Sequence, residues 1–207
     1  EERPAKKGGH DLANAAKLAE CDAVFLAGGW GRYFFPPAAA RKTFVRYVAA
    51  GGGALVSGFR GGYVRTANRP MFPEIAEVCN RLSSSWVGGY GTSPLAKAFG
   101  GHAVSCGSND HLVLKVGPQG EVFAVAGSDP AGAAGDVGLG RAIVYGGHFT
   151  YTPGDETSED NERIFLAMLE YLTARKKPTA KDAAKAADIA ETAFLRRERT
   201  WDIMLDE

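Results

Sequence analysis

The chain has 207 residues, of which 45% are hydrophobic and 23% charged, as in an ordinary globular domain. Lysine plus arginine and aspartate plus glutamate number 24 each, so the net charge offers no long-range attraction for nucleic acid or an anionic membrane surface. Three cysteines without a CxxC arrangement give neither a disulfide framework nor a zinc-ligand pattern. The polar opening and the lack of an apolar run of roughly 20 residues favour a soluble chain, cytoplasmic or secreted after processing.

In the first part of the chain, short apolar runs alternate with helical patterns, which is typical of a parallel sheet covered by helices. The unbroken apolar run at 23–27 predicts a strand buried on both faces. Apolar residues at four-residue spacing predict a helix over 38–50, which a run of glycines ends. A second buried strand is expected at 54–57, and a further helix around 74–82.

The middle of the chain is less regular. The Gly- and Ser-rich stretch 83–101 predicts loops with short pairings. The segments 111–116 and 121–126 flank a Gly-Pro-Gln-Gly turn signal and predict a hairpin. Another strand is expected at 141–145. A long helix should begin near Glu159, because acids in its first turn and basic residues at its last complement the helix dipole.

Residues 178–207 predict a C-terminal helical extension to an α/β domain over 1–177. The apolar residues of this tail fall near one helical stripe and are Ala187, Ala190, Phe194, Trp201 and Leu205. Such a stripe should be covered, either by the helix's own domain or by a partner such as a second copy in a homodimer. Nothing before residue 23 resembles a strand, although a doubly wound sheet normally begins with one. Either the fold lacks its first strand or upstream residues are missing from the chain.

Three segments in chain order resemble the class I glutamine amidotransferase-like superfamily. Asp22, the strand after it and Gly28-Gly29 are similar to the D-x-x-x-x-x-G-G start of those domains. Residues 44–63 resemble their helix, glycine pause, strand and sharp elbow. Residues 138–149 resemble the late strand that delivers a histidine to the same cleft. The resemblance implies a three-layer α/β sandwich with a mainly parallel, flavodoxin-like sheet.

Within the superfamily, the trehalose-utilisation (ThuA-like) and biotin–protein ligase N-terminal-like families are the most similar. The ThuA-like ending G-x-G-R-x-x-Y-x-x-x-G-H is approached by the run from Gly138 to Arg141 and then by the run from Tyr145 to His148. The resemblance covers about residues 21–173.

The elbow residue differs from the superfamily pattern, which reads G-x-C-x-G. Here the matching run from Gly58 to Gly62 keeps the glycines but has Arg60 in place of the nucleophilic cysteine. A guanidinium stays protonated and has no acceptor lone pair, so it neither attacks a carboxamide nor takes a proton. The chain is therefore not expected to be a cysteine-dependent glutaminase. Arg60 can instead hold a carboxylate or phosphate, or pair internally with Asp155 or Glu156.

The resemblance places His148 where the amidotransferases have their histidine, but the glutamate that orients it is missing. His148 is still a candidate acid, base or metal ligand, with a hydrogen-bonded wall residue as the alternative. Asp110 is a weaker catalytic candidate, since the ThuA-like pattern has an acidic pair near it. With His102 and His148 it could contribute to a metal site, or else it caps a turn. Cys79 and Cys106 have no base specified beside them.

The loop after the first strand lies where doubly wound sheets bind ligands. Trp30 and Tyr33 can stack on a sugar ring and Arg32 can meet an anion; alternatively, Trp30 only covers the loop above buried phenylalanines. The resemblance places the N–H groups of Gly29 and Trp30 at the oxyanion hole. The ligand-binding candidates are thus Gly28, Gly29, Trp30, Arg32, Arg60 and Gly61.

The sequence therefore predicts a glutamine amidotransferase-like domain that lacks the nucleophile and binds a small polar or carbohydrate-derived ligand. The carbohydrate element depends on the ThuA-like resemblance and the aromatic loop. One alternative is a non-catalytic pseudoenzyme that recruits a partner through its tail. The other is a divergent hydrolase or isomerase that uses His148 with Asp110 or Asp155. No cofactor is expected, because no G-K-[ST] follows the glycine runs, and neither nucleic acid nor a membrane is an expected partner.

Overall fold

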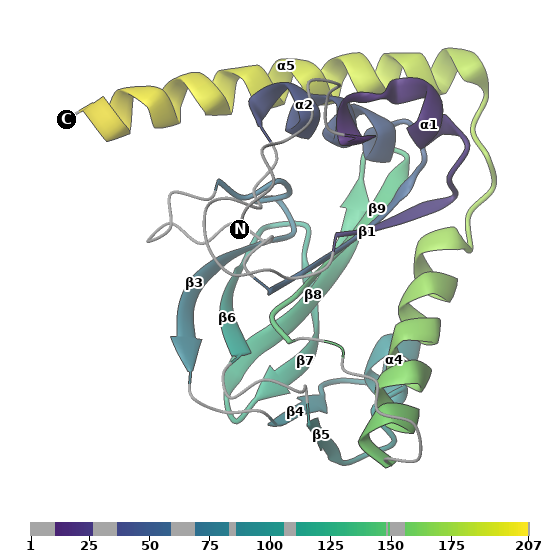
Figure 1. Cartoon of the computed structure of the whole chain (residues 1–207), viewed down its shortest axis with the longest axis vertical. Helices are drawn as coiled ribbons and strands as arrows, with labels where there is room; N and C mark the ends of the chain where they lie inside the picture. The colour runs from purple at the N-terminus through teal and green to yellow at the C-terminus, as the bar shows by residue number, and fades with distance from the viewer. Residues whose placement is uncertain are drawn as a thin grey trace, which may run out of the picture.

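A computed structural model describes residues 11–26, 37–58, 69–82, 86–105, 111–147, 149 and 156–206. A seven-stranded mixed sheet has the strand order β1-β2-β9-β8-β7-β4-β5, and a separate two-stranded sheet pairs β3 with β6 (Figure 1). The strands are β1 (Ala23–Leu26), β2 (Gly53–Ser57), β3 (Ala76–Leu82), β4 (Trp86–Gly89), β5 (Ala103–Ser105), β6 (His111–Val116), β7 (Glu121–Ala126), β8 (Asp129–Val137) and β9 (Gly140–Tyr145). The helices are η1 (Asp11–Ala13), α1 (Ala15–Ala19), α2 (Ala38–Ala49), α3 (Pro94–Lys97), α4 (Glu156–Thr173) and α5 (Ala180–Asp206).

The parallel part of the large sheet consists of β1, β2 and β9. These strands confirm the three that the apolar runs predict, with ends that agree within a residue. Every residue of β2 is buried, because β2 lies between two strands and under helices on both faces. β1 is different: Phe25 is 36% exposed and its neighbours are half-buried. The expectation that β1 is buried on both faces is wrong, since β1 is the last described strand at its end of the sheet.

The rest of the large sheet is antiparallel, which corrects the expected mainly parallel sandwich. Strands β9, β8, β7, β4 and β5 each pair antiparallel with the next. Two tight hairpins join β7 to β8 and β8 to β9, and each turn opens with a left-handed glycine, Gly127 at φ 62° and Gly138 at φ 61°. The sequence analysis predicts no strand over β8, because its alanines and glycines lack strand propensity. Small residues are needed there: a Cβ on Gly132 would lie 2.6 Å from the Phe123 ring.

The small sheet overturns two further predictions. Residues 76–82 form strand β3 instead of the expected helix, because antiparallel pairing with β6 overrides local helix propensity. The predicted hairpin of 111–116 with 121–126 has the right strands but the wrong pairing, since β6 pairs with β3 and β7 with β8. The turn between β6 and β7 is hydrogen-bonded to the residues just before β3. Gly117 N–H donates to the Ile75 carbonyl at 2.9 Å, and Gln119 N–H donates to the Glu74 carbonyl at 2.8 Å. These bonds carry β6 toward β3.

Helices cover both faces of the large sheet. α4 packs on one face, over a core that includes Leu55, Ile143 and Met168. α2 packs on the other face, and α5 packs against the outer side of α2 (Figure 1). α2 confirms the predicted helix over 38–50, and α4 begins three residues before the expected Glu159. The domain therefore has three layers: α4 on one face, the mixed sheet in the middle, and on the other face a layer that contains α2, α5 and the small sheet.

The predicted C-terminal helix is present as α5. Thr179 caps its first turn by accepting a hydrogen bond from the Asp182 N–H at 3.2 Å, and its hydroxyl donates to the Asp182 carboxylate. Ala187 and Phe194 are buried against the domain, so α5 covers this part of its apolar stripe intramolecularly. The division at residue 177 and the homodimer stay predictions. Within the described chain, no helix has both the length and the apolarity to span a bilayer.

Candidate functional site

The candidate site is the edge of the large sheet where the three parallel strands end. Leu26 of β1 is in register with Val56 of β2, and Ser57 of β2 with Tyr145 of β9. The last residues of these strands therefore lie side by side at one edge, here called the carboxyl edge. In open α/β sheets, ligands bind outside the carboxyl ends of parallel strands. The three segments that the sequence analysis selects follow these three strands directly in the chain.

The exit from β2 has the backbone that an elbow requires. Ser57 is buried, and Gly58 has φ 57°, in the left-handed region that glycine enters without steric cost. A left-handed residue directly after β2 agrees with the elbow that the motif predicts, whose other residues lie outside the described part of the chain. A residue with a Cβ at position 58 would strain this turn. Gly58 thus has a structural role of its own, independent of the residue at position 60.

The exit from β9 is held by close backbone packing. Gly146 N–H donates to the Ala131 carbonyl at 2.7 Å, and the Gly146 carbonyl accepts from the Leu112 N–H at 3.1 Å. A Cβ on Gly146 would lie 2.0 Å from the Leu112 carbonyl oxygen, and one on Gly147 would lie 2.7 Å from the Tyr145 ring. Only glycine fits at these two positions. Gly146 is therefore needed to bring the end of β9 against β6 and β8, whereas Gly147 leaves room for the Tyr145 ring.

An aromatic cluster anchors the chain just after the candidate histidine. The Phe149 ring lies 5.2 Å from the Tyr145 ring centroid, 5.7 Å from that of Phe25 and 5.3 Å from that of Phe165. These contacts join β1, β9 and α4 below the carboxyl edge.

Most of the predicted site residues lie outside the described part of the chain. These are Gly28, Gly29, Trp30, Arg32, Arg60, Gly61, Asp110 and His148. The same holds for Tyr33, Cys106 and Asp155, and for the side chain of Glu156. Their roles stay predictions.

His102 is described, and it is engaged elsewhere. Its Nε2 lies 3.0 Å from the Asp160 carboxylate and its Nδ1 lies 3.3 Å from the Gly100 carbonyl. The hydrogen bond to Asp160 raises the pKa of His102, which favours the imidazolium. With both ring nitrogens engaged, the histidine has no free lone pair for a metal. Across the described residues, no three His, Cys, Asp or Glu side chains are grouped as metal ligands.

Cys79 is a poor nucleophile in this structure. It lies at an irregularity of β3, between the paired residues Val78 and Asn80, and its thiol donates to the Val113 carbonyl at 3.5 Å. Partial burial raises the pKa of the Cys79 thiol, which disfavours the reactive thiolate.

A charged cluster that the sequence analysis missed joins α5 to the start of α2. Arg41 and Glu198 form a buried ion pair, and Arg69 donates to the same Glu198 carboxylate at 2.8 Å. Asp202 accepts from Arg69 at 2.6 Å on the exposed side. Burial lowers the pKa of Arg41 against the opposing effect of Glu198. The signal in the sequence is an arginine beside the apolar face of a predicted helix, Arg41 next to Ala40.

The cluster lies in the layer that contains α2 and α5, on the side nearer to the carboxyl edge. α2 connects the parallel strands β1 and β2, so it runs from the carboxyl edge back to the opposite edge. α5 is antiparallel to α2, because Glu198 pairs with Arg41 near the start of α2 whereas Asp188 pairs with Arg46 near its end, at 2.9 Å. The last turns of α5 therefore extend toward the side of the domain that carries the candidate site.

Comparisons with known proteins agree on the fold. No family model matches the sequence, and no curated protein matches it. A cytoplasmic protein from Salmonella typhimurium LT2 is structurally similar, with a TM-score of 0.60 at 16% identity over 76% of this chain and 74% of that one. The mmIFT52 N-terminal domain gives 0.58 at 17% identity, over 78% of this chain and 81% of its own. A putative ThuA-like protein from Bacteroides uniformis gives 0.55 at 13% identity, over 81% and 76%.

At these identities the likeness establishes a shared fold and nothing of the chemistry. The ThuA-like neighbour agrees with the resemblance that the sequence motifs suggest, at the level of the fold.

Proposed function

We propose that this chain is an amidotransferase-like domain without the cysteine nucleophile, and that it binds a small polar anion, such as a sugar acid or sugar phosphate, at the carboxyl edge. In this proposal Arg60 holds the anionic group through paired hydrogen bonds. Trp30 stacks on the sugar ring, and the N–H groups of the Gly28–Gly29 turn approach the polar oxygens. His148 lines the same site from β9.

The observation that carries the proposal is the register of the parallel strands. Because β1, β2 and β9 end side by side, the three segments that follow them all begin at one edge. In the sequence, Gly28 comes two residues after β1, and Arg60 and His148 come three residues after β2 and β9, respectively. The left-handed Gly58 supports an elbow at the middle strand. The ThuA-like neighbour supports the carbohydrate element only as a likeness of fold.

Calorimetric titration with three probes tests the proposal: glucose 6-phosphate, glucuronate and uncharged glucose. We expect the two anions to bind and glucose to bind much more weakly. Losing a charge-assisted hydrogen-bond pair costs about 1.5–3 kcal/mol, so Arg60→Ala should weaken anion binding roughly 10- to 150-fold. Arg199→Ala removes an equal charge from an exposed position of α5 and is the matched control. Equal affinity of the two variants for glucose 6-phosphate would refute the role of Arg60.

An interaction module is the second candidate function, and exposed apolar side chains on α5 favour it. Ile189 is 62% exposed and Leu195 is 47% exposed, although Phe194 beside them is buried. Contact between two copies of α5 would cover them. Light scattering of wild type and of Ile189→Glu with Leu195→Glu tests this: a dimer that the double variant dissociates supports it, and a wild-type monomer at high concentration argues against self-association.

A further inference from the structure

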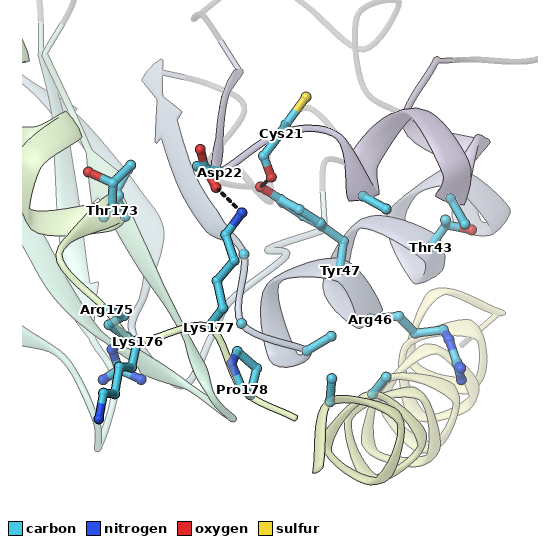
Figure 2. A pocket seen from close by; sticks show the side chains of 18 residues that line it. Cys21, Asp22, Thr43, Arg46, Tyr47, Thr173, Arg175, Lys176, Lys177 and Pro178 are labelled. Carbon is cyan, nitrogen blue, oxygen red and sulfur yellow. Dashed lines mark hydrogen bonds and ion pairs between the residues drawn. The ribbon is translucent and has the colours of Figure 1, made fainter. Parts of the chain in front are cut away.

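A cavity of about 430 Å³ lies at the opposite edge of the sheet, where the parallel strands begin (Figure 2). Its walls come from α1, the end of α2, the segment between α4 and α5, and the first turns of α5. Small-molecule sites in proteins typically have volumes of this order. The cavity is distinct from the carboxyl edge, because α2 and the parallel strands separate the two.

The cavity exists because its walls are made of small residues. Ala15, Ala19, Ala183 and Ala187 line it from α1 and α5 and leave the space between those helices open. Its floor is fixed by glycine contacts, since a Cβ on Gly52 would lie 2.3 Å from the Tyr47 ring. A Cβ on the neighbouring Gly51 would lie 2.8 Å from Pro178, so the segment that leads into α5 is held against the end of α2.

Tyr47 provides the aromatic wall of the cavity. Its hydroxyl donates to the Cys21 carbonyl at 3.0 Å, which fixes the ring. Burial raises the pKa of Tyr47 to about 12, so the phenol stays neutral at physiological pH. The wall therefore presents an uncharged ring face and no anion of its own.

The charged groups at the cavity differ in how firmly they are held. Arg46 already binds the carboxylates of Asp188 and Glu191 on α5. Arg175 binds Asp136 and donates to the Leu139 carbonyl at 2.7 Å. Each of these guanidiniums has at least two protein partners, so neither is readily available to a ligand.

Asp22 and Lys177 form an ion pair that a ligand can replace. Their charged atoms lie 3.0 Å apart, and the side chains are 66% and 88% exposed. Figure 2 shows Lys177 reaching across to Asp22 beside Tyr47, whereas Lys176 points away from Asp22. An ion pair this exposed contributes little stability and opens readily to other partners. The mouth of the cavity thus offers one carboxylate and one ammonium group whose mutual ion pair is exposed to solvent.

From this arrangement we infer a second ligand site, for a zwitterionic α-amino acid with an apolar side chain. The ligand's ammonium group pairs with Asp22 and its carboxylate pairs with Lys177, so two new ion pairs replace the one between the protein groups. The side chain enters the alanine-lined space against the Tyr47 ring. A ligand with only one charge satisfies one of the two protein groups and leaves the other to solvent.

The test uses L-phenylalanine and two analogues that each lack one charge, 3-phenylpropanoate and 2-phenylethylamine. Binding is followed by backbone NMR titration of the full chain. We expect shift changes at Tyr47, Gly52 and Ala183, and each analogue should bind roughly fivefold more weakly than phenylalanine. Asp22→Asn should remove the preference over 3-phenylpropanoate, and Lys177→Gln the preference over 2-phenylethylamine. Lys176→Gln is the control of equal charge and should preserve both preferences.

Filling the cavity provides an independent readout. Ala183→Leu should abolish the phenylalanine shifts, whereas Ala184→Leu, one residue along the exposed side of α5, should preserve them. Equal binding of the three probes, absence of shifts with all three, or binding that survives Ala183→Leu would each overturn the inference. Arg60→Ala should not alter phenylalanine binding, so this site and the one at the carboxyl edge succeed or fail separately.

Discussion

Arg41 in the first turn of α2 and Glu198 in α5 are 157 residues apart in the sequence and form a buried ion pair. Glu198 is shared with Arg69, so two guanidiniums face one carboxylate inside the interface between α5 and the domain. Breaking a buried pair from one side leaves an uncompensated charge, which usually costs more than the pair itself contributes. This cluster is therefore the polar contact that fixes α5 most firmly on the domain.

We predict that Glu198→Ala lowers the free energy of unfolding by about 3–5 kcal/mol, because it leaves the buried Arg41 guanidinium without its carboxylate and takes one of two carboxylates from the half-buried Arg69. Urea denaturation followed by circular dichroism measures this. Asp202→Ala removes an exposed acid that binds the same Arg69, and should cost less than about 1 kcal/mol. Similar losses in the two variants would show that the Arg41–Glu198 pair does not hold α5.

His102 should titrate above its ordinary range, because its hydrogen bond to Asp160 raises its pKa. A raised pKa in the folded state stabilises the protein fully below the unfolded pKa of about 6.5, and this contribution disappears as the pH rises through the folded value. The difference in Tm between wild type and His102→Gln should therefore shrink from pH 5.5 to 8.5. NMR titration of the His102 ring in Asp160→Asn is the direct check, and an unchanged ring pKa there would contradict the assignment.

Gly146 should not tolerate a side chain, because a Cβ would lie 2.0 Å from the backbone oxygen of Leu112. We predict that Gly146→Ala destabilises the protein by about 2–4 kcal/mol, in the range of overpacking at a rigid site. Gly88→Ala is the control, since its nearest neighbour would be 3.9 Å away. Thermal unfolding measures both variants, and a mild effect at Gly146 would mean that β9 can move away from β6.

A cysteine at position 60 should not by itself confer glutaminase activity. Under the proposed function, position 60 is the elbow, so Arg60→Cys places a thiol there. No glutamate follows His148 closely as it does in the amidotransferases, so His148 should not activate the thiol. We expect no glutamate release from glutamine above wild type. Adding Thr150→Glu supplies a carboxylate shortly after the histidine and gives the matched variant in which activity can appear. Turnover by Arg60→Cys alone would contradict the proposal that the chain lacks both the nucleophile and the carboxylate that orients His148.

How much of the fold is predictable depends on whether the signal is local. β2 and β9 are continuous apolar runs and α2 has a clear helical period, so both kinds of element are predicted correctly. The centre of β8 consists of alanine and glycine, because Phe123 and the turn at Gln119 approach it closely, a cause that no local pattern reveals. β3 becomes a strand only through its pairing with β6. Both strands therefore depend on contacts between segments that are distant in the sequence.

The candidate site divides in the same way. The elbow glycine Gly58 and the glycine pair before His148 are predicted from motifs, and the structure gives physical reasons for them. The Arg41–Glu198 pair and the cavity beside Tyr47 are assembled from segments far apart in the sequence. Single-sequence periodicity carries no information on such contacts. Motifs in the sequence therefore predict the carboxyl edge as a candidate site, but they do not predict the ion pair or the cavity at the opposite edge.

The most direct test of the central claim is a crystal structure of the full chain soaked with glucose 6-phosphate. The account predicts density for the sugar phosphate at the carboxyl edge, with the phosphate within hydrogen-bonding distance of the Arg60 guanidinium. An Arg60 side chain bound instead to Asp155 or Glu156, with no sugar phosphate at that edge, would contradict it.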